Sequence, residues 1–282
     1  VRGTISMGDT VDAFVDTVKR EDTARNHTAT HLLHAALRQV LGPHVRQAGS
    51  LVAPDRMRFD FTHIQGMTPK EIRDVEDLVN KEIRENSTVS THELAYTDAL
   101  QEGALAFFGD KCGEKVRVVE VGCSTDTQTC FSKEVCGGTH LQNTGQMGLF
   151  LVTSEGSIGS GIRRIEALTG EAAQTKMWEL REQAESLARD LEVSPNELSA
   201  KIQSLVTTMN FDIKRISELE RTLALKEAEE LISMVKEVNN IRVLAARILT
   251  IPPETLREIG DYLKQKIGTG VILLGTVFND RP

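Results

Sequence analysis

The chain has 282 residues, of which 40% are hydrophobic and 26% are charged, and its formal net charge is −8. This length and composition are typical of a globular protein with about two domains. The negative charge argues against the whole chain being an electrostatic nucleic-acid binder, although it does not exclude a local basic groove. No apolar run reaches the roughly 18 residues that a transmembrane helix needs.

The first part of the chain alternates between strand-like and helix-like periodicity. We expect a strand at 11–18, with Val11, Ala13 and Val15 on one face, and a helix from about residue 22 to 41 that ends at Gly42. A capping box, Thr68-Pro69-Lys70-Glu71, predicts the start of another helix. Further strands are expected at 49–53, 58–62, 89–94, 116–121, 148–154 and 162–168, with a short helix near 97–102. Helices interleaved with antiparallel-type strands make residues 1–170 an α+β unit.

The composition changes after Gly170, where the chain becomes rich in Glu, Leu, Lys and Ala. Apolar residues from Ala173 to Leu191 follow a 4-3-4-3-4 spacing, which is typical of a coiled-coil seam. A second capping box at 194–197 starts another long helix, so we predict a long antiparallel helical hairpin over residues 171–240, as a spacer or a dimerisation arm. Residues 241–282 predict a truncated β-α-β piece, with strands at 243–251 and 270–278 and a helix at 253–267. A piece of this length cannot cover its own core.

Four cysteines, Cys112, Cys123, Cys130 and Cys136, are too few and too loosely spaced for the disulfide scaffold of a secreted domain. Cys136 is better explained as a metal ligand in a reducing compartment, so we assign the chain to the cytoplasm or an organelle matrix. We expect the other three cysteines to be buried small hydrophobic residues. The chain also starts without a methionine or a signal-like segment, so we expect it to be cut from a longer protein.

Two short motifs carry the candidate chemistry. His27 and His31 are four residues apart in a helical segment, so both imidazoles can face one point. Cys136 and His140 have the same spacing around a glycine pair that lets the backbone turn tightly. Three histidines and one cysteine are a donor set that zinc favours, and four protein ligands favour a closed structural site unless one ligand is labile.

Other interpretations of these residues are less well supported. A zinc peptidase needs a glutamate directly after the first histidine, but Thr28 follows His27. A dinucleotide-binding loop needs G-x-G-x-x-G before a helix, whereas the glycines at 156–161 have another order and precede a strand pattern. His34 could replace one ligand, but the first two histidines have the cleaner spacing, so we place it outside the ligand set or in the core.

Four segments together resemble the editing domain of alanyl-tRNA synthetases: R-N-H-T-A-T-H-L-L-H-A-A-L, Q-A-G-S-L-V-A-P-D-R-M-R-F-D-F, V-C-G-G-T-H and G-I-R-R-I-E-A-L-T-G. The resemblance covers residues 1–170 in order and implies a zinc-containing α+β editing domain with a mixed or antiparallel sheet. The hairpin at 171–240 and the α/β piece at 241–282 are similar to the C-terminal region of that family, which serves dimerisation and tRNA binding. Free-standing alanyl-tRNA editing proteins share the first part, and the editing site of threonyl-tRNA synthetases shares the metal-type motifs.

The resemblance implies hydrolysis of Ser-tRNA(Ala), and of Gly-tRNA(Ala), at the aminoacyl ester. It implies a Zn²⁺ ion bound by His27, His31, Cys136 and His140, with tRNA(Ala) as partner and a homodimer through the hairpin and the C-terminal region. A second, hydrolytic site is needed to remove errors, because a pocket for alanine rejects a slightly smaller or larger amino acid by only about 1–3 kcal/mol. The ATP-dependent ligation site is expected before Val1.

Further site residues follow from the same resemblance. Thr30 matches the position that senses the serine hydroxyl, while Gln47 and Arg163 match polar positions that line the pocket and hold the tRNA end. We expect zinc to orient the aminoacyl group or a water, and backbone N–H groups of Gly137 and Gly138 to stabilise the oxyanion. No carboxylate general base stands in these motifs, so attack assisted by the terminal ribose hydroxyl stays open. The alternative function is a non-catalytic, zinc-stabilised module for tRNA binding and dimerisation.

Overall fold

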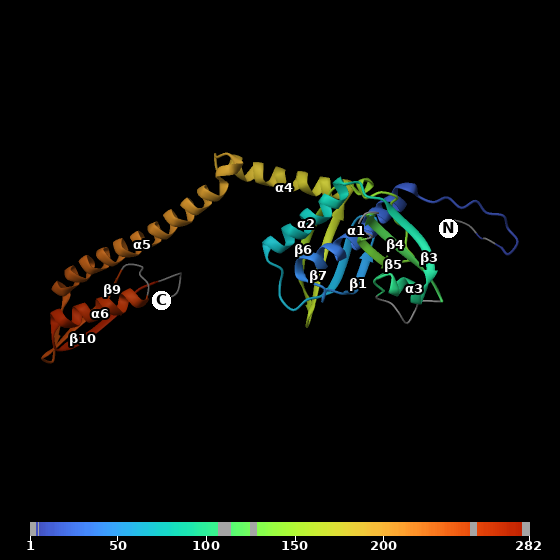
Figure 1. The fold of residues 1–282 in the computed structure, drawn as a ribbon. Coiled ribbons are helices and arrows are strands. Elements are labelled where there is room, and N and C mark those ends of the chain that lie inside the picture. Colours follow the sequence, from blue (N-terminus) through green and yellow to red (C-terminus); the bar gives the residue numbers. More distant parts are fainter. Residues whose placement is uncertain (1–3, 5, 107–113, 125–128, 249–252, 278–282) are drawn as a thin grey trace. The chain divides into compact units, whose positions relative to one another are not determined.

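The computed structural model describes residues 4, 6–106, 114–124, 129–248 and 253–277 (Figure 1). The chain forms two compact units, Val1–Gln183 and Ala184–Pro282. Within the described ranges, no helix has the length and apolar character needed to cross a membrane.

In its described part, the first unit consists of two antiparallel sheets and the helices packed on them. The strands of the larger sheet pair in the order β1-β2-β7-β6 and those of the smaller sheet in the order β3-β4-β5. The elements are α1 (Thr17–Leu41), β1 (Gln47–Val52), β2 (Met57–Thr62), α2 (Pro69–Arg84), β3 (Val89–Ala95), α3 (Tyr96–Gln101), β4 (Lys115–Cys123), β5 (Cys130–Val135), β6 (Phe150–Gly159) and β7 (Ile162–Thr169), with a 3₁₀ turn at η2 (Thr144–Met147). The expected α+β class with antiparallel sheets is confirmed.

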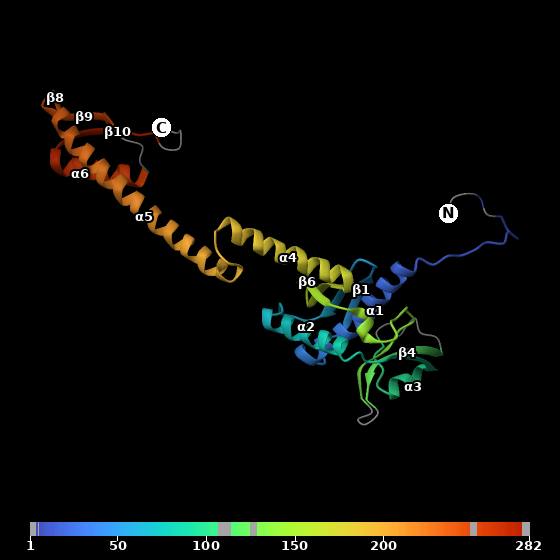
Figure 2. The ribbon, with the colours of Figure 1, turned by 90° about the horizontal axis from the view of Figure 1, so that it is seen from above.

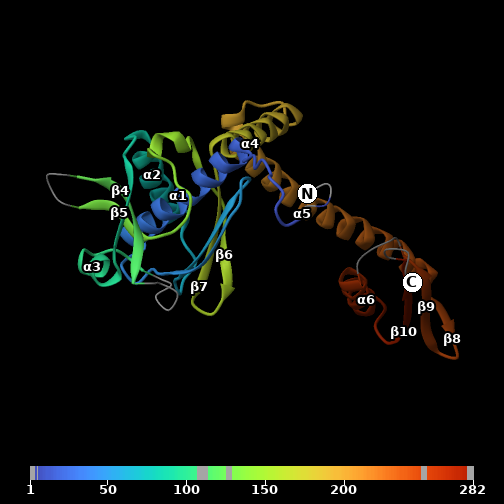
Figure 3. The same cartoon turned by 90° about the vertical axis from the view of Figure 1, so that its right-hand side faces the viewer.

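Helix α1 lies between the two sheets of the first unit (Figure 3). Asp16 caps its start by accepting a hydrogen bond from the backbone N–H of Lys19, and Gly42, with a φ of 116°, ends it. The helix contacts β1, β2 and β7 of one sheet and β5 of the other, and all residues from Thr28 to Leu37 are buried. Because both faces are covered, polar side chains of this segment are held in the interior and must find partners there.

The strand expected at 11–18 is wrong, and its last two residues belong to α1. Residues 9–16 have no regular secondary structure, and Val11 and Val15 are 60% and 62% exposed. An alternating pattern forms a strand only where a neighbouring strand satisfies its backbone groups. The helix instead begins at Thr17, five residues before the predicted start, because Asp16 supplies the cap.

Strand β2 carries the centre of the larger core. Its residues Met57, Phe59 and Phe61 alternate and are almost fully buried, in one cluster with residues of α1, α2, β6 and β7. Asp60 between them accepts two hydrogen bonds from Arg164, its direct partner on β7. The packing fixes the larger sheet against α1, the helix that carries the first ligand pair.

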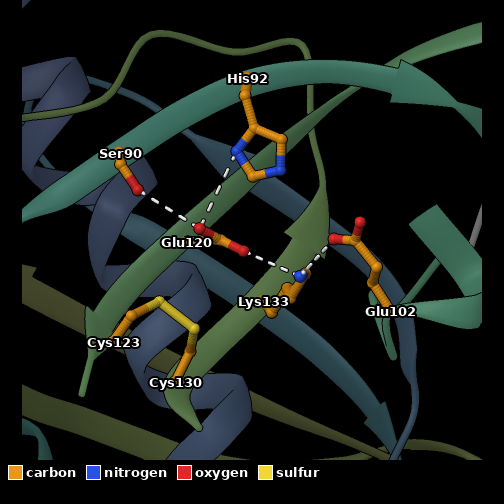
Figure 4. The surroundings of a disulfide bond; sticks show 7 residues. All are labelled: Ser90, His92, Glu102, Glu120, Cys123, Cys130 and Lys133. Carbon is orange, nitrogen blue, oxygen red and sulfur yellow. Dashed lines mark hydrogen bonds and ion pairs between the residues drawn. A yellow bond between two sulfur atoms is a disulfide. The ribbon is translucent and has the colours of Figure 1, made fainter. Parts of the chain in front are cut away.

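Cys123 at the end of β4 lies opposite Cys130 at the start of β5, and the two sulfur atoms form a disulfide (Figure 4). The expectation of buried small hydrophobic residues is therefore wrong for this pair, since Cys123 is exposed and Cys130 half-buried. Both occupy the loop end of the β4–β5 hairpin, where the two strands are connected. Cys112 lies outside the described residues.

We expect Cys123→Ser to lower the free energy of unfolding of the oxidised protein by about 2 kcal/mol. A bridge between positions seven residues apart restricts the unfolded chain by about this amount. Urea titrations of both proteins with and without dithiothreitol measure it, and the difference should disappear in the reductant. A difference that persists in the reductant would mean that the Cys123 side chain stabilises the fold without the bridge.

The second unit has its core where the end of α5 (Leu198–Leu231) meets a β-α-β segment (Figure 2). Strands β9 (Ile241–Arg247) and β10 (Gly270–Gly275) are parallel and are connected through α6 (Pro253–Ile267), as expected for this segment. Strand β8 (Lys236–Val238), which was not expected, adds an antiparallel edge to β9. The core consists of Ala224, Ala228, Leu231, Leu244, Ile248, Ile259, Leu263 and Ile267, and two 3₁₀ turns, η3 (Pro195–Glu197) and η4 (Ile232–Met234), flank α5.

Two long helices occupy the region of the expected hairpin. Helix α4 (Gly170–Asp190) is followed by the predicted capping box of Ser194 and Glu197 and then by α5. Because α4 crosses the boundary between the two units, the antiparallel packing of α4 on α5 stays a prediction.

Candidate metal centre

Helix α1 and the loop after β5 bring the four expected ligands together. One nitrogen of each of His27, His31 and His140 and the sulfur of Cys136 all lie within 4.8 Å of one another. Nε2 of His27 and Nε2 of His140 are each 3.4 Å from Sγ of Cys136. Ligand atoms on a tetrahedral zinc with bonds of about 2.0–2.3 Å are roughly 3.5 Å apart, so these separations fit such an ion.

The buried ring of His31 adds a second argument for a metal. Among the residues that the structure describes, no group makes a hydrogen bond with its Nε2. Buried polar atoms are nearly always paired, so an unpaired imidazole nitrogen facing a cysteine and two histidines fits a ligand position.

The loop that carries Cys136 is anchored at both ends by Arg117 of β4. The backbone N–H of Cys136 donates to the carbonyl of Arg117, and the guanidinium of Arg117 donates to the carbonyl of Gly138. These two bonds tie the turn to β4.

The two glycines of this turn have different surroundings. A Cβ atom on Gly138 would lie 1.7 Å from Cε1 of His27, whereas a Cβ on Gly137 would have no heavy atom within 4 Å. The His27 ring therefore packs directly on the backbone of Gly138, and any side chain at 138 would displace the ring or the turn.

Opposite charges accumulate in the cluster. Burial raises the pKa of the Cys136 thiol, but hydrogen bonds from His140 and His27 and the nearby imidazole of His31 outweigh it and lower that pKa to about 3. Burial also disfavours the charged form of His31, yet the negative charges of Glu134 and Cys136 raise its pKa to about 10. Burial is the main cause of the lowered pKa of His140. Cys136 is thus held as a thiolate, the form that binds metals.

Glu134 is the most important residue of the site that sequence reasoning missed. One carboxylate oxygen lies 2.7 Å from Nδ1 of His31 and the other 2.8 Å from Nδ1 of His34. Burial opposes ionisation of Glu134, but the two histidines lower its pKa to about 2. A signal existed: alternation along a strand places Glu134 and Cys136 on one face, and a metal-binding histidine needs a partner for its second nitrogen.

Thr28, which appeared in the sequence only as an argument against a peptidase, supports His140. Its hydroxyl lies 3.4 Å from Nδ1 of His140 and accepts a hydrogen bond from the backbone N–H of Leu141. His34 is buried and bonds Glu134, outside the ligand set as expected.

The remaining predicted site residues have local partners. The Thr30 hydroxyl donates to the carbonyl of His27 at 2.7 Å, next to the ligands. Gln47 donates to the Ser50 hydroxyl at 2.9 Å, and Arg163 makes two hydrogen bonds, of 2.6 and 2.7 Å, to Glu155. Gln47 and Arg163 therefore contact residues other than the four ligands. The roles expected for Thr30, Gln47 and Arg163 stay predictions.

Known proteins resemble the chain over the same region and beyond it. Residues 116–166 match the family described as the threonyl and alanyl tRNA synthetase second additional domain. The alanine--tRNA ligases of Dehalococcoides mccartyi and Chloroflexus aurantiacus are each 43% identical to it, over 282 and 287 aligned residues that include all of this chain. That of Acetivibrio thermocellus is 44% identical over 279 residues, or 99% of the chain. The chain is homologous to the alanine--tRNA ligases.

The resemblance found in the motifs is thereby confirmed, and it extends through both units. The chain spans about a third of the length of these alanine--tRNA ligases, 32%, 32% and 31% respectively. The matched family segment contains β4, β5 and the Cys136–His140 loop, so half of the ligand cluster lies inside it.

Proposed function

We propose that residues 1–170 are the hydrolytic editing domain of an alanine--tRNA ligase, which removes serine or glycine from mischarged tRNA(Ala). Residues 171–240 would form the helical arm and 241–282 the start of a C-terminal domain. The observation that carries this proposal is the cluster of three histidines and one cysteine in a homologue of these ligases. We place the protein in the cytoplasm, where tRNA is charged.

His27, His31, Cys136 and His140 would hold Zn²⁺, which their donor atoms and spacing fit. When bound, the ion would supply positive charge beside the aminoacyl ester or a water molecule. Because two of the four ligands are on α1 and two are in the loop after β5, the bound ion would also hold these two segments together.

Thr30 is suited to recognise serine. Its hydroxyl proton is already donated to the carbonyl of His27, so its oxygen is left as an acceptor. An acceptor at this point favours a substrate that carries a hydroxyl and gains nothing from alanine.

The other proposed roles concern the reacting ester and the end of the tRNA. Backbone N–H groups of Gly137 and Gly138 would stabilise the oxyanion, in a turn that Arg117 keeps rigid. Gln47 and Arg163 would hold the terminal nucleotide, for which Arg163 must share or leave Glu155. Glu134 is buried and bound to two histidines, so it is not available as a general base, and assistance by the ribose hydroxyl is favoured.

Deacylation of Ser-tRNA(Ala) by this chain tests the proposal, with Ala-tRNA(Ala) as the substrate that should be spared. Cys136→Ala should reduce the rate by more than about 100-fold, because losing a ligand is more severe than losing a residue that orients one. Cys123→Ser is the matched control, since it removes a cysteine outside the cluster and should keep the rate. Unchanged turnover in Cys136→Ala would overturn the role of the cluster.

One observation favours the alternative of a non-catalytic, zinc-stabilised module for tRNA binding and dimerisation. Helix α5 exposes apolar side chains with heptad-like spacing, which a second copy of the helix could cover. They are Ile202, Leu205, Met209, Ile216, Leu219 and Leu223. Zinc uptake and tRNA binding without any deacylation by the wild-type chain would support this module against the editing hydrolase.

A further inference from the structure

We propose that Glu134 is a positioning residue for the metal centre: it fixes the ring of His31 so that Nε2 presents its lone pair to the ion. The inference rests on the metal site of the proposed function and adds a residue that none of the motifs contains.

Glu134 is enclosed where β5 passes α1. Glu134 is only 3% exposed and His31 only 5%. One carboxylate oxygen of Glu134 lies 2.7 Å from Nδ1 of His31. His34, one turn further along α1, bonds the other carboxylate oxygen at 2.8 Å. The hydroxyl of Ser132 lies 3.3 Å from that second oxygen. Because both oxygens are engaged, these contacts fix the plane of the carboxylate.

The carboxylate determines which nitrogen of His31 carries the proton. An ionised carboxylate only accepts hydrogen bonds, so Nδ1 of His31 must be the donor. A neutral imidazole has a single N–H, which leaves Nε2 with a free lone pair. That nitrogen belongs to the group formed with Cys136, and in the described part of the chain it has no hydrogen-bond partner. The carboxylate therefore holds the ring in the direction that metal binding requires, and it keeps a proton on Nδ1 when a metal ion replaces the proton on Nε2.

Strand β5 carries Glu134 and leads directly into the metal-binding loop. Strand β5 ends at Val135, and the next residue is the ligand Cys136. One strand thus supplies a ligand and, two residues earlier, the group that orients a ligand on another element. By contrast, the group that the described residues place at Nδ1 of His140 is the neutral hydroxyl of Thr28 at 3.4 Å. His31 thus has a short hydrogen bond to a buried, charged carboxylate at its second nitrogen.

Two substitutions at Glu134 and one control test this role. Glu134→Gln keeps the side-chain volume but replaces one acceptor oxygen by an N–H₂ donor, so it cannot accept from both histidines. Glu134→Ala removes both acceptors. Glu82→Gln is the matched control, because Glu82 is another buried glutamate of the first unit and takes no part in the cluster. Competition of the whole chain with a chromophoric chelator for Zn²⁺ measures the dissociation constant.

We expect the dissociation constant for zinc to rise about 10- to 100-fold in the Glu134 variants and to stay unchanged in Glu82→Gln. A second measurement separates positioning from general destabilisation. In the zinc-loaded wild type, the Nδ1–H of His31 should be a slowly exchanging imidazole proton in NMR spectra, and it should be lost in Glu134→Ala. Should that variant not fold, Glu134→Gln carries both measurements.

The outcomes distinguish this role from the proposed function. A wild-type chain that takes up no zinc would overturn the metal centre, and the role of Glu134 with it. A wild type that binds zinc, with variants of equal affinity and an unchanged His31 N–H signal, would overturn only the role of Glu134. Weaker binding together with loss of that signal supports it.

Discussion

Gly138→Ala should abolish zinc binding and deacylation, whereas Gly137→Ala, one residue away, should keep both. The new methyl group at 138 would lie 1.7 Å from Cε1 and 2.3 Å from Nδ1 of His27, far inside van der Waals contact. Either the imidazole leaves its position or the turn opens. The hydrogen bond from Arg117 to the carbonyl of Gly138 opposes opening of the turn, so we expect the imidazole to move. We expect the zinc affinity to fall by at least about 100-fold, since one of four ligands is displaced.

Gly137→Ala is the control because a Cβ there meets nothing within 4 Å. Chelator competition for zinc and deacylation of Ser-tRNA(Ala) should both be measured for the pair of variants. Equal losses in the two would mean that the turn needs glycine for its backbone conformation, and the packing of His27 on Gly138 would not be the cause. Equal retention would show that His27 can bind the ion from another position.

The ligands could be predicted from the sequence because each half of the set depends on local geometry. His27 and His31 are one helical turn apart, and Cys136 and His140 are joined by a short glycine turn. Two local pairs with complementary donors indicate a single site without knowledge of the fold. The structure brings the pairs together where α1 contacts the end of β5.

The supporting residues could not be predicted in the same way. Glu134 and His31 are 103 positions apart, and their contact exists only because β5 packs against α1. The disulfide depends on the register of β4 and β5, which pairs Cys123 with Cys130 and which a one-residue slip would break. The strand expected at 11–18 failed for a related reason, since an alternating pattern does not show whether a partner strand is present. Local spacing in the sequence is enough to predict the metal ligands. The residues that support them depend on strand register and on packing between distant segments.

The metal-free chain should keep a nearly constant stability between pH 6.5 and 9 and lose stability below pH 6.5. Cys136 has a folded pKa of about 3 against an ordinary 9.0, so its contribution is complete above pH 9 and is lost as the pH falls toward 3. His31 has a folded pKa of about 10 against 6.5, so its contribution is complete below pH 6.5 and is lost as the pH rises toward 10. Between pH 6.5 and 9 the two slopes have opposite signs and cancel.

Below pH 6.5 only the Cys136 slope remains from this pair, because His31 is then protonated in both the folded and the unfolded chain. The lowered pKa of His140 adds a loss of stability in the same direction, because the unfolded histidine takes up its proton first. One extra proton bound by the unfolded chain costs about 1.4 kcal/mol per pH unit, or about 3 kcal/mol between pH 6.5 and 4.5. Glu134, whose pKa is about 2 against 4.5, adds its own loss only at still lower pH. Urea titrations of EDTA-treated protein at several pH values measure the slope. Cys136→Ser removes the titrating thiol and should make the slope less steep, whereas equal slopes in the two proteins would mean that the histidine cluster does not hold Cys136 as a thiolate.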